Sequence, residues 1–157
     1  MIRRHCVLAA LALAAVSLTG GTPAAFAADK VCKLEISAND AMQYDKKELS
    51  VAGDCTQVEL TLTHTGKLPA AAMGHNWVLV KTADVTAVAN AGMTAGLAAN
   101  YLTPNDPRVI ASTKIIGGGQ STTITFPTSK LTKGGDYTYI CTFPGHYVIM
   151  KGSFKFG

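Results

Sequence analysis

Three side chains that bind soft or borderline metals fall within ten residues near the C-terminal end of the chain. Cys141, His146 and Met150 lie in the segment CTFPGHYVIM, and its Pro-Gly pair predicts a turn before His146. Thiolate, imidazole and thioether together suit copper, with the thioether as a weak axial ligand. Such a set needs a second histidine, and His75 in the segment MGHNW is the best supplier. The spacing therefore predicts a copper site.

The ten residues read as a connection between two strands. Apolar residues alternate with others over 137–141, before the connection, and again over 152–156, after it. Cys141 would then leave the first strand and Met150 would open the second. A connection of this kind can bring all three side chains around one point.

Short alternating segments recur along the whole chain and predict an all-β fold. Glycine-rich turns separate them, which favours a two-sheet Greek-key β-sandwich of about eight strands. The run Trp77 to Val80 is continuously apolar, as expected of a strand covered on both faces. One short helix is expected over Asp84 to Ala99, with Asp84 as N-cap and two glycines weakening it. The expected strands lie near 34–36, 49–51, 58–62, 77–80, 109–113, 122–126, 137–141 and 152–156.

The first 27 residues read as a signal peptide. Two arginines precede an apolar run that is too short to span a membrane, and Ala25-Phe26-Ala27 is a small-x-small cleavage signal. We expect a periplasmic domain over residues 28–157, without a membrane anchor. Removing Arg3 and Arg4 leaves 12 basic against 10 acidic residues, a net charge near +2. Because the remaining lysines are scattered, nucleic acid is not an expected partner.

Three cysteines remain after cleavage, and in an oxidising compartment two of them should pair. A Cys32–Cys55 bridge would close a loop of roughly twenty residues and stabilise the fold by about 3 kcal/mol. The other two pairings would use Cys141 and remove the metal ligand. Cys32–Cys55 is the pairing that keeps the site.

Three other interpretations of the site stay open at this point. Cys141 with a histidine could be a nucleophilic thiol and its base, although no carboxylate is placed to orient the pair. Zinc also accepts one cysteine and two histidines, but it seldom recruits methionine. A copper storage or delivery protein could use the same ligands, but it would need fast metal exchange.

With these segments together, the chain resembles the cupredoxins, the family of small blue copper proteins. The likeness rests on residues 73–79 (MGHNWVL), 141–146 (CTFPGH) and 150–152 (MKG), and it extends over essentially the whole mature chain. It implies a plastocyanin-like copper domain that carries electrons and is not an enzyme. One type 1 copper would be held by His75, Cys141 and His146, with Met150 as long axial ligand and the Gly74 carbonyl opposite. It also implies backbone amides of Asn76 and Phe143 directed at the thiolate, and the Cys32–Cys55 disulfide.

Apolar residues flank the expected ligands and suggest a docking surface. Met73, Met93, Pro144 and Leu68 would form a collar around His146, suited to brief encounters. The expected partners are redox proteins such as c-type cytochromes, or copper or haem reductases and dehydrogenases. His64, which follows a strand, is expected to be partly buried and bonded to backbone, with protonation able to influence the copper potential.

Overall fold

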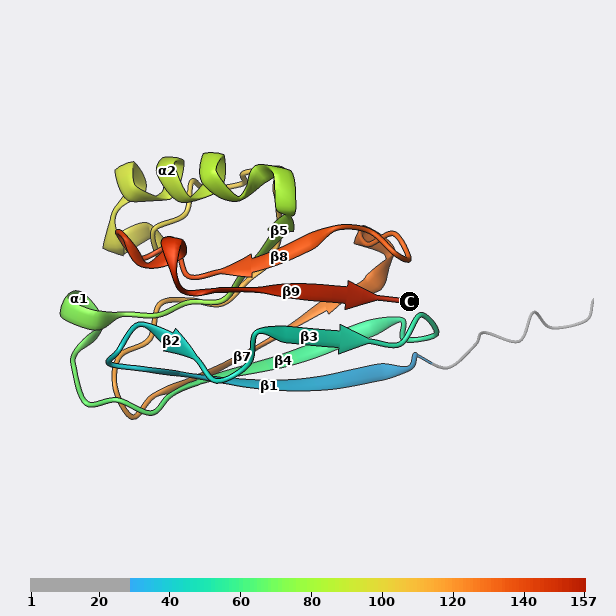
Figure 1. The fold of residues 1–157 in the computed structure, drawn as a ribbon, viewed down its shortest axis with the longest axis horizontal. Coiled ribbons are helices and arrows are strands. Elements are labelled where there is room, and N and C mark those ends of the chain that lie inside the picture. The colour runs from blue at the N-terminus through green and yellow to red at the C-terminus, as the bar shows by residue number, and fades with distance from the viewer. Residues whose placement is uncertain (1–28) are drawn as a thin grey trace, which may run out of the picture.

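The computed structural model describes residues 29–157, which form a sandwich of two sheets (Figure 1). One sheet has the order β2-β1-β4-β7 and the other has the order β3-β9-β8-β5-β6. The strands are β1 (Val31–Asn39), β2 (Gln43–Tyr44), β3 (Glu48–Val51), β4 (Gln57–His64), β5 (Val78–Lys81), β6 (Val109–Ser112), β7 (Ser121–Pro127), β8 (Tyr137–Ile140) and β9 (Lys151–Phe156). The all-β sandwich predicted from alternation is therefore confirmed.

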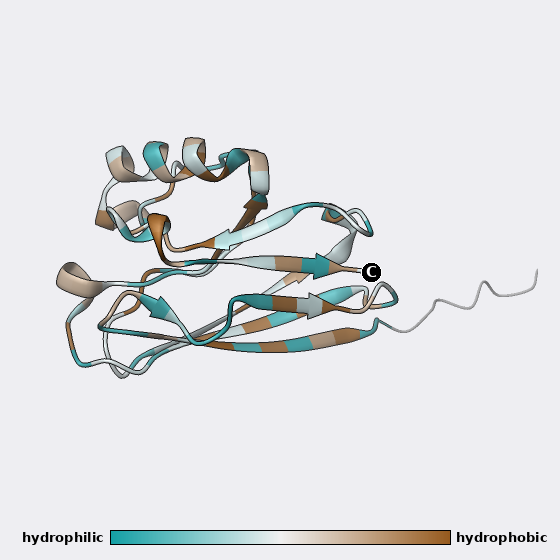
Figure 2. Ribbon diagram, in the orientation of Figure 1, coloured by the Kyte–Doolittle hydropathy of each residue, from teal (hydrophilic) through white to brown (hydrophobic). Residues whose placement is uncertain are grey.

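Both sheets are mixed. β1 runs parallel to β4, and β3 runs parallel to β9, whereas the remaining pairs are antiparallel. Apolar and polar residues alternate along β1 and β4, which Figure 2 shows as bands. One face of this sheet is therefore apolar and faces inward, and the other faces solvent. Trp77, Tyr139 and Phe154 fill the space between the sheets with no exposed surface.

The helical elements lie outside the two sheets. α1 (Ala70–Met73) precedes β5, and α2 (Val85–Ala95) follows it, with short 3-10 turns at Thr82–Asp84, Leu97–Ala99, Thr128–Lys130 and His146–Val148. Val88 and Ala89 of α2 pack against Val78, Val80 and Ile140, on the face of β5 and β8 turned away from Trp77. β5 is thus covered on both faces, as its continuous apolar run predicted.

The element predictions need four corrections. The structure has nine strands among the described residues, because the two-residue β2 is too short to show alternation. The helix predicted over Asp84 to Ala99 ends at Ala95, since Gly96 adopts a φ of +75° that helical residues avoid. Asp84 does occupy the N-cap position, but its side chain makes no capping hydrogen bond. α1 was not predicted.

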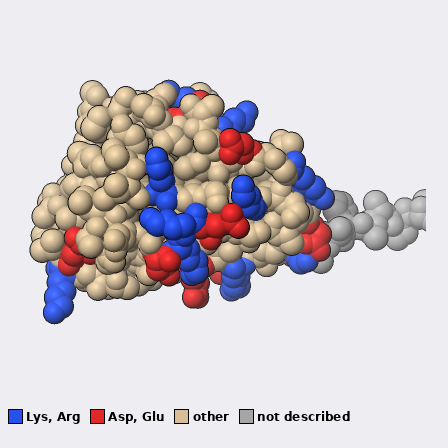
Figure 3. Space-filling model, in the orientation of Figure 1, with Lys and Arg blue, Asp and Glu red and all other residues tan. Residues whose placement is uncertain are grey.

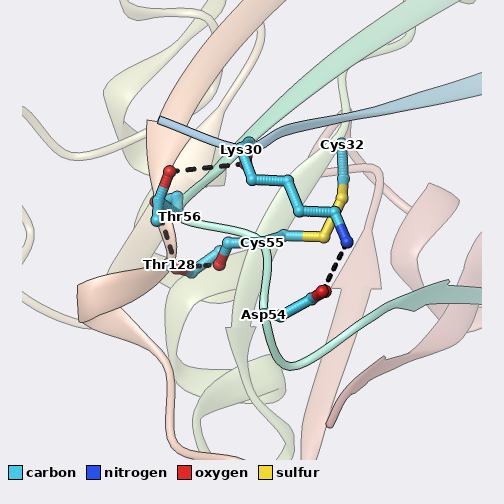
Figure 4. Close-up of a disulfide and its surroundings, with 6 residues drawn as sticks. All are labelled: Lys30, Cys32, Asp54, Cys55, Thr56 and Thr128. Atoms are coloured by element: carbon cyan, nitrogen blue, oxygen red, sulfur yellow. Dashed lines mark hydrogen bonds and ion pairs between the residues drawn. A yellow bond between two sulfur atoms is a disulfide. The ribbon is translucent and has the colours of Figure 1, made fainter. Parts of the chain in front are cut away.

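The predicted disulfide joins Cys32 at the start of β1 to Cys55 before β4 (Figure 4), with the two Cα atoms 5.9 Å apart. Next to it, Lys30 pairs with Asp54 at 2.5 Å, and the Thr128 hydroxyl donates to the Cys55 carbonyl at 2.7 Å. This bridge fixes the end of the sandwich from which β1 starts. The predicted signal peptide, 1–27, lies outside the described residues.

Candidate metal centre

The predicted ligands come from two connections at the same end of the sandwich. His75 lies between α1 and β5, where it exchanges backbone hydrogen bonds of 3.0 and 2.9 Å with Ile116. Cys141 follows β8, His146 lies in the turn after it, and Met150 precedes β9. The tight turn before His146 depends on Gly145, whose φ of +81° is costly for any residue with a side chain.

The structure brings His75, Cys141 and His146 together. The Cys141 sulfur is 3.8 Å from Nδ1 of His75 and 3.6 Å from Nδ1 of His146. One ligand atom from each residue lies within 4.8 Å of the others, and all three side chains are buried. Two imidazole nitrogens and one thiolate therefore face a common point.

Each imidazole is neutral and turned toward this point. Nε2 of His75 donates to the Asn39 carbonyl at the end of β1, at 2.8 Å, which leaves the Nδ1 lone pair free for a metal. Burial lowers the pKa of His75 and of His146 from 6.5 to about 4. At neutral pH both rings can bind a metal without first losing a proton.

The Cys141 thiol, unlike the two imidazoles, must lose a proton before it can bind a metal. Burial raises the pKa of Cys141 from 9.0 to about 12, although the backbone amides of Asn76 and Phe143 donate to its sulfur and lower the pKa in part. The thiol stays protonated without a metal, so metal binding must displace that proton. These two amides are the ones the sequence resemblance named.

Hydrogen bonds through Asn76 tie the two ligand connections together. Its side-chain carbonyl accepts from the Thr142 amide at 2.9 Å, and its side-chain amide donates to the Thr142 hydroxyl at 2.8 Å. The same amide group donates to the Asn100 carbonyl at 3.0 Å. Because Asn76 follows His75 and Thr142 follows Cys141, this network fixes the distance between the two ligands.

Met150 and Gly74 complete the surroundings. Met150 is fully buried, and its backbone bonds to both Cys141 (3.0 Å) and His146 (2.7 Å). The Gly74 carbonyl lies 3.9 Å from the Cys141 sulfur. A Cβ at Gly74 would lie 2.4 Å from the Ala70 carbonyl oxygen, so only glycine fits there without a shift. A buried cysteine and two imidazoles, with a buried methionine bonded through its backbone to two of these residues, fit copper.

His64 lies behind the site. Its Nδ1 accepts from the Gly66 amide at 3.0 Å, its Nε2 donates to the Met73 carbonyl at 2.9 Å, and its ring stacks on His75 with centroids 4.5 Å apart. The expected bonding to backbone is present, but the side chain is fully rather than partly buried. His64 therefore supports the ring of His75 and does not reach the common point of the ligands with a free nitrogen.

The predicted collar is largely exposed. Leu68 and Met93 each expose 42% of their surface, Pro144 is exposed, and Met73 is half-buried. Sequence reasoning missed Val148 and Ile149, which expose 58% and 51% and lie two and three residues after His146. Their apolar character beside a ligand was the signal that could have identified them. In Figure 3 charged side chains gather over the middle and the end near the C-terminus, while the end with α1 and α2 is mostly uncharged.

Comparisons with known proteins agree with this geometry. Residues 30–157 match a family described as copper binding proteins, plastocyanin/azurin family. The chain is 52% identical over 124 residues to azurin-1 of Alcaligenes xylosoxydans xylosoxydans, covering 79% of this chain and 96% of that protein. It is 54% identical over 124 residues to the azurin of Achromobacter denitrificans, covering 79% and 83%. Among solved structures, the azurin Az-iso2 from Methylomonas sp. strain J superposes with a TM-score of 0.78 at 44% identity, covering 80% of this chain and 98% of that one.

Proposed function

This chain belongs to the plastocyanin/azurin family of copper-binding proteins, and we propose that it is a periplasmic one-electron carrier with one type 1 copper per chain. The observation that carries the proposal is the buried His75–Cys141–His146 cluster, with sulfur-to-nitrogen distances of 3.8 and 3.6 Å. These three residues would hold the copper, with Met150 and the Gly74 carbonyl as further donors. The copper supplies the chemistry, because it alternates between Cu(II) and Cu(I).

The residues around the site keep the ligands in place while the charge changes. Cu(I) favours sulfur and Cu(II) favours nitrogen, so a mixed set serves both states with little rearrangement. The Asn39 carbonyl fixes the ring of His75, and the Asn76–Thr142 pair fixes the spacing of the two connections. The amides of Asn76 and Phe143 stabilise negative charge on the Cys141 sulfur. Burial of the whole set excludes water.

The predicted partners are redox proteins such as c-type cytochromes, or copper or haem reductases and dehydrogenases. Docking would use the apolar collar of Leu68, Met73, Met93 and Pro144 near His146. An exposed apolar surface without charges suits short-lived encounters. No helix among residues 29–157 is long and apolar enough to cross a membrane, and the location of the protein rests on the predicted signal peptide.

A visible absorption spectrum after addition of Cu(II) tests the proposal. We expect an intense thiolate-to-copper charge-transfer band toward the red, and a Cys141→Ser variant should stay pale. A colourless protein that binds copper would contradict the assignment. The same sample also tests the thiol-enzyme and copper-delivery interpretations, since a thiol enzyme would be alkylated at Cys141 when loaded with copper, and a delivery protein would exchange its copper rapidly.

A further inference from the structure

The sheet that contains β1 and β4 ends at an unpaired strand. β7 pairs only with β4, so its other side faces away from the sheet. The backbone groups of β7 point alternately toward β4 and away from it. Hydrogen bonds just beyond the two ends of the strand show which residues face β4, since the His64 amide donates to the Gln120 carbonyl and the Thr128 amide donates to the Thr56 carbonyl. This register turns the amides and carbonyls of residues 122, 124 and 126 toward β4. Those of Ser121, Thr123 and Thr125 point outward and have no partner among residues 29–157.

β7 has only part of the usual protection of an edge strand, because its one proline, Pro127, is its last residue. Exposed edges are normally blunted by charge, proline, bulges or short length. Over Ser121–Pro127 the sequence STTITFP contains no charged residue, and its β-branched residues favour the extended state. The other edges among the described residues are different. β2 has two residues, β3 begins with Glu48, and β6 has four residues and a register shift in its ladder.

We propose that β7 is a self-association edge, on which a second copy of this chain pairs its own β7 in antiparallel orientation. A twofold axis at Thr123 places Thr123 opposite its own copy and Ser121 opposite Thr125 of the partner. Three residue pairs then exchange two hydrogen bonds each, which uses every outward group between 121 and 125. Pro127 has no amide to donate, and this register leaves it beyond the paired residues, so the proline does not interrupt the pairing.

A second copy is the occupant that the side chains favour. On the solvent face, hydroxyl pairs already join β4 to β7, with Thr61 to Thr123 and Thr63 to Ser121 both at 2.9 Å. The twofold pairing continues these rows with Thr123 beside Thr123 and Ser121 beside Thr125, and cross-strand hydroxyl pairs are favourable. No charge lies on the paired segment, so two identical edges meet without repulsion.

The pairing leaves the metal centre of each copy accessible. Ser121 lies at the end of the sheet near His64, and Pro127 lies opposite Gln57 at the disulfide end. Antiparallel association therefore puts the two metal centres at opposite ends of an eight-stranded sheet. The interface is small, and we expect a dissociation constant on the order of 0.1–1 mM.

Sedimentation equilibrium of the copper-loaded chain from residue 28, at about 10 μM to 1 mM, tests the proposal. Thr123→Pro removes the central outward amide and should raise the dissociation constant of the dimer by tenfold or more. Thr123→Lys places like charges opposite each other on the axis and should give a monomer, as should Thr123→Glu. A mixture of these two charged variants should restore the dimer, because lysine then faces glutamate. The control Ser50→Lys, on the edge strand β3, adds the same charge elsewhere and should associate like the parent.

Hydrogen exchange identifies the surface that is used. The amides of Ser121, Thr123 and Thr125 should exchange fast in dilute protein and slow at least tenfold at 1 mM, whereas the amides of 122, 124 and 126 stay slow throughout. The charge-transfer band confirms that each variant is folded. A chain that stays monomeric at 1 mM overturns the proposal and leaves the edge to an extended segment of another protein. A dimer that keeps these three amides fast, or that forms equally in both charged variants alone, also overturns it.

Discussion

Removal of the metal should make this protein sensitive to acid in a defined pH range. In the folded, metal-free chain the pKa of His75 and of His146 is about 4, against 6.5 for an ordinary histidine, because both rings are buried. Between pH 6.5 and 4 the unfolded chain therefore binds more protons than the folded chain. The stability that depends on neutral rings is fully present above pH 6.5 and is lost as the pH falls toward 4.

The expected loss is large compared with the stability of a small domain. At pH 5, a pKa difference of this size costs about 2 kcal/mol for each ring, or about 4 kcal/mol for both. A domain of this size is stable by about 5–15 kcal/mol, so much of the total would disappear. The midpoint of urea unfolding should fall by more than about 1 M between pH 7 and pH 5.

Urea titrations of the metal-free chain from residue 28 measure this loss, with Trp77 fluorescence as the probe. Trp77 is fully buried, and its indole N–H is the one buried side-chain donor without a partner among residues 29–157, so unfolding should shift its emission strongly. His146→Gln should halve the pH dependence, and copper loading should suppress it until the metal leaves. A free energy of unfolding that is constant from pH 7 to pH 5, or a dependence unchanged by His146→Gln, would refute the reasoning.

Three further predictions test the site and its frame. Gly74→Ala should broaden or shift the charge-transfer band and destabilise the fold by about 1–3 kcal/mol, measured by absorption and urea unfolding, because its Cβ would lie 2.4 Å from the Ala70 carbonyl oxygen. Replacing Cys32 and Cys55 by serine should cost about 3 kcal/mol in urea unfolding and leave the copper spectrum unchanged, since the bridge lies at the far end of β1 from Asn39. Met73→Glu should slow electron exchange, measured by stopped flow, with an unchanged spectrum. An unchanged exchange rate would remove Met73 from the docking surface.

The sequence predicted the parts of this structure that depend on side-chain type. Alternation identified the longer strands, because burial of one face imposes a period of two. The continuous run before Lys81 identified β5 as covered on both faces. The short spacing of metal-binding side chains predicted that Cys141, His146 and Met150 share one connection. An odd number of cysteines favoured the Cys32–Cys55 bridge. Each of these signals depends only on which residue types occupy which positions.

What the sequence did not predict depends on backbone groups. β2 was missed because two residues carry no period, and the side-chain cap at Asp84 was wrong because a 3-10 turn already precedes α2. The Asn39 carbonyl orients His75, yet any residue at that position offers a carbonyl. The outward amides of β7 likewise follow from register, which only the paired strands reveal.

The same distinction explains how the site is made rigid. Cys141 and Met150 are adjacent because their backbones continue the ladder of β8 and β9, and His75 is placed by its bridge to Ile116. Cys141, Met150 and His75 are thus held by the sandwich itself, with the Asn76–Thr142 pair as the side-chain link between the two connections. A metal that changed charge in the proposed site would meet side chains that the sandwich has already placed. The β-sandwich is therefore part of the redox chemistry, because it determines how little the ligands move.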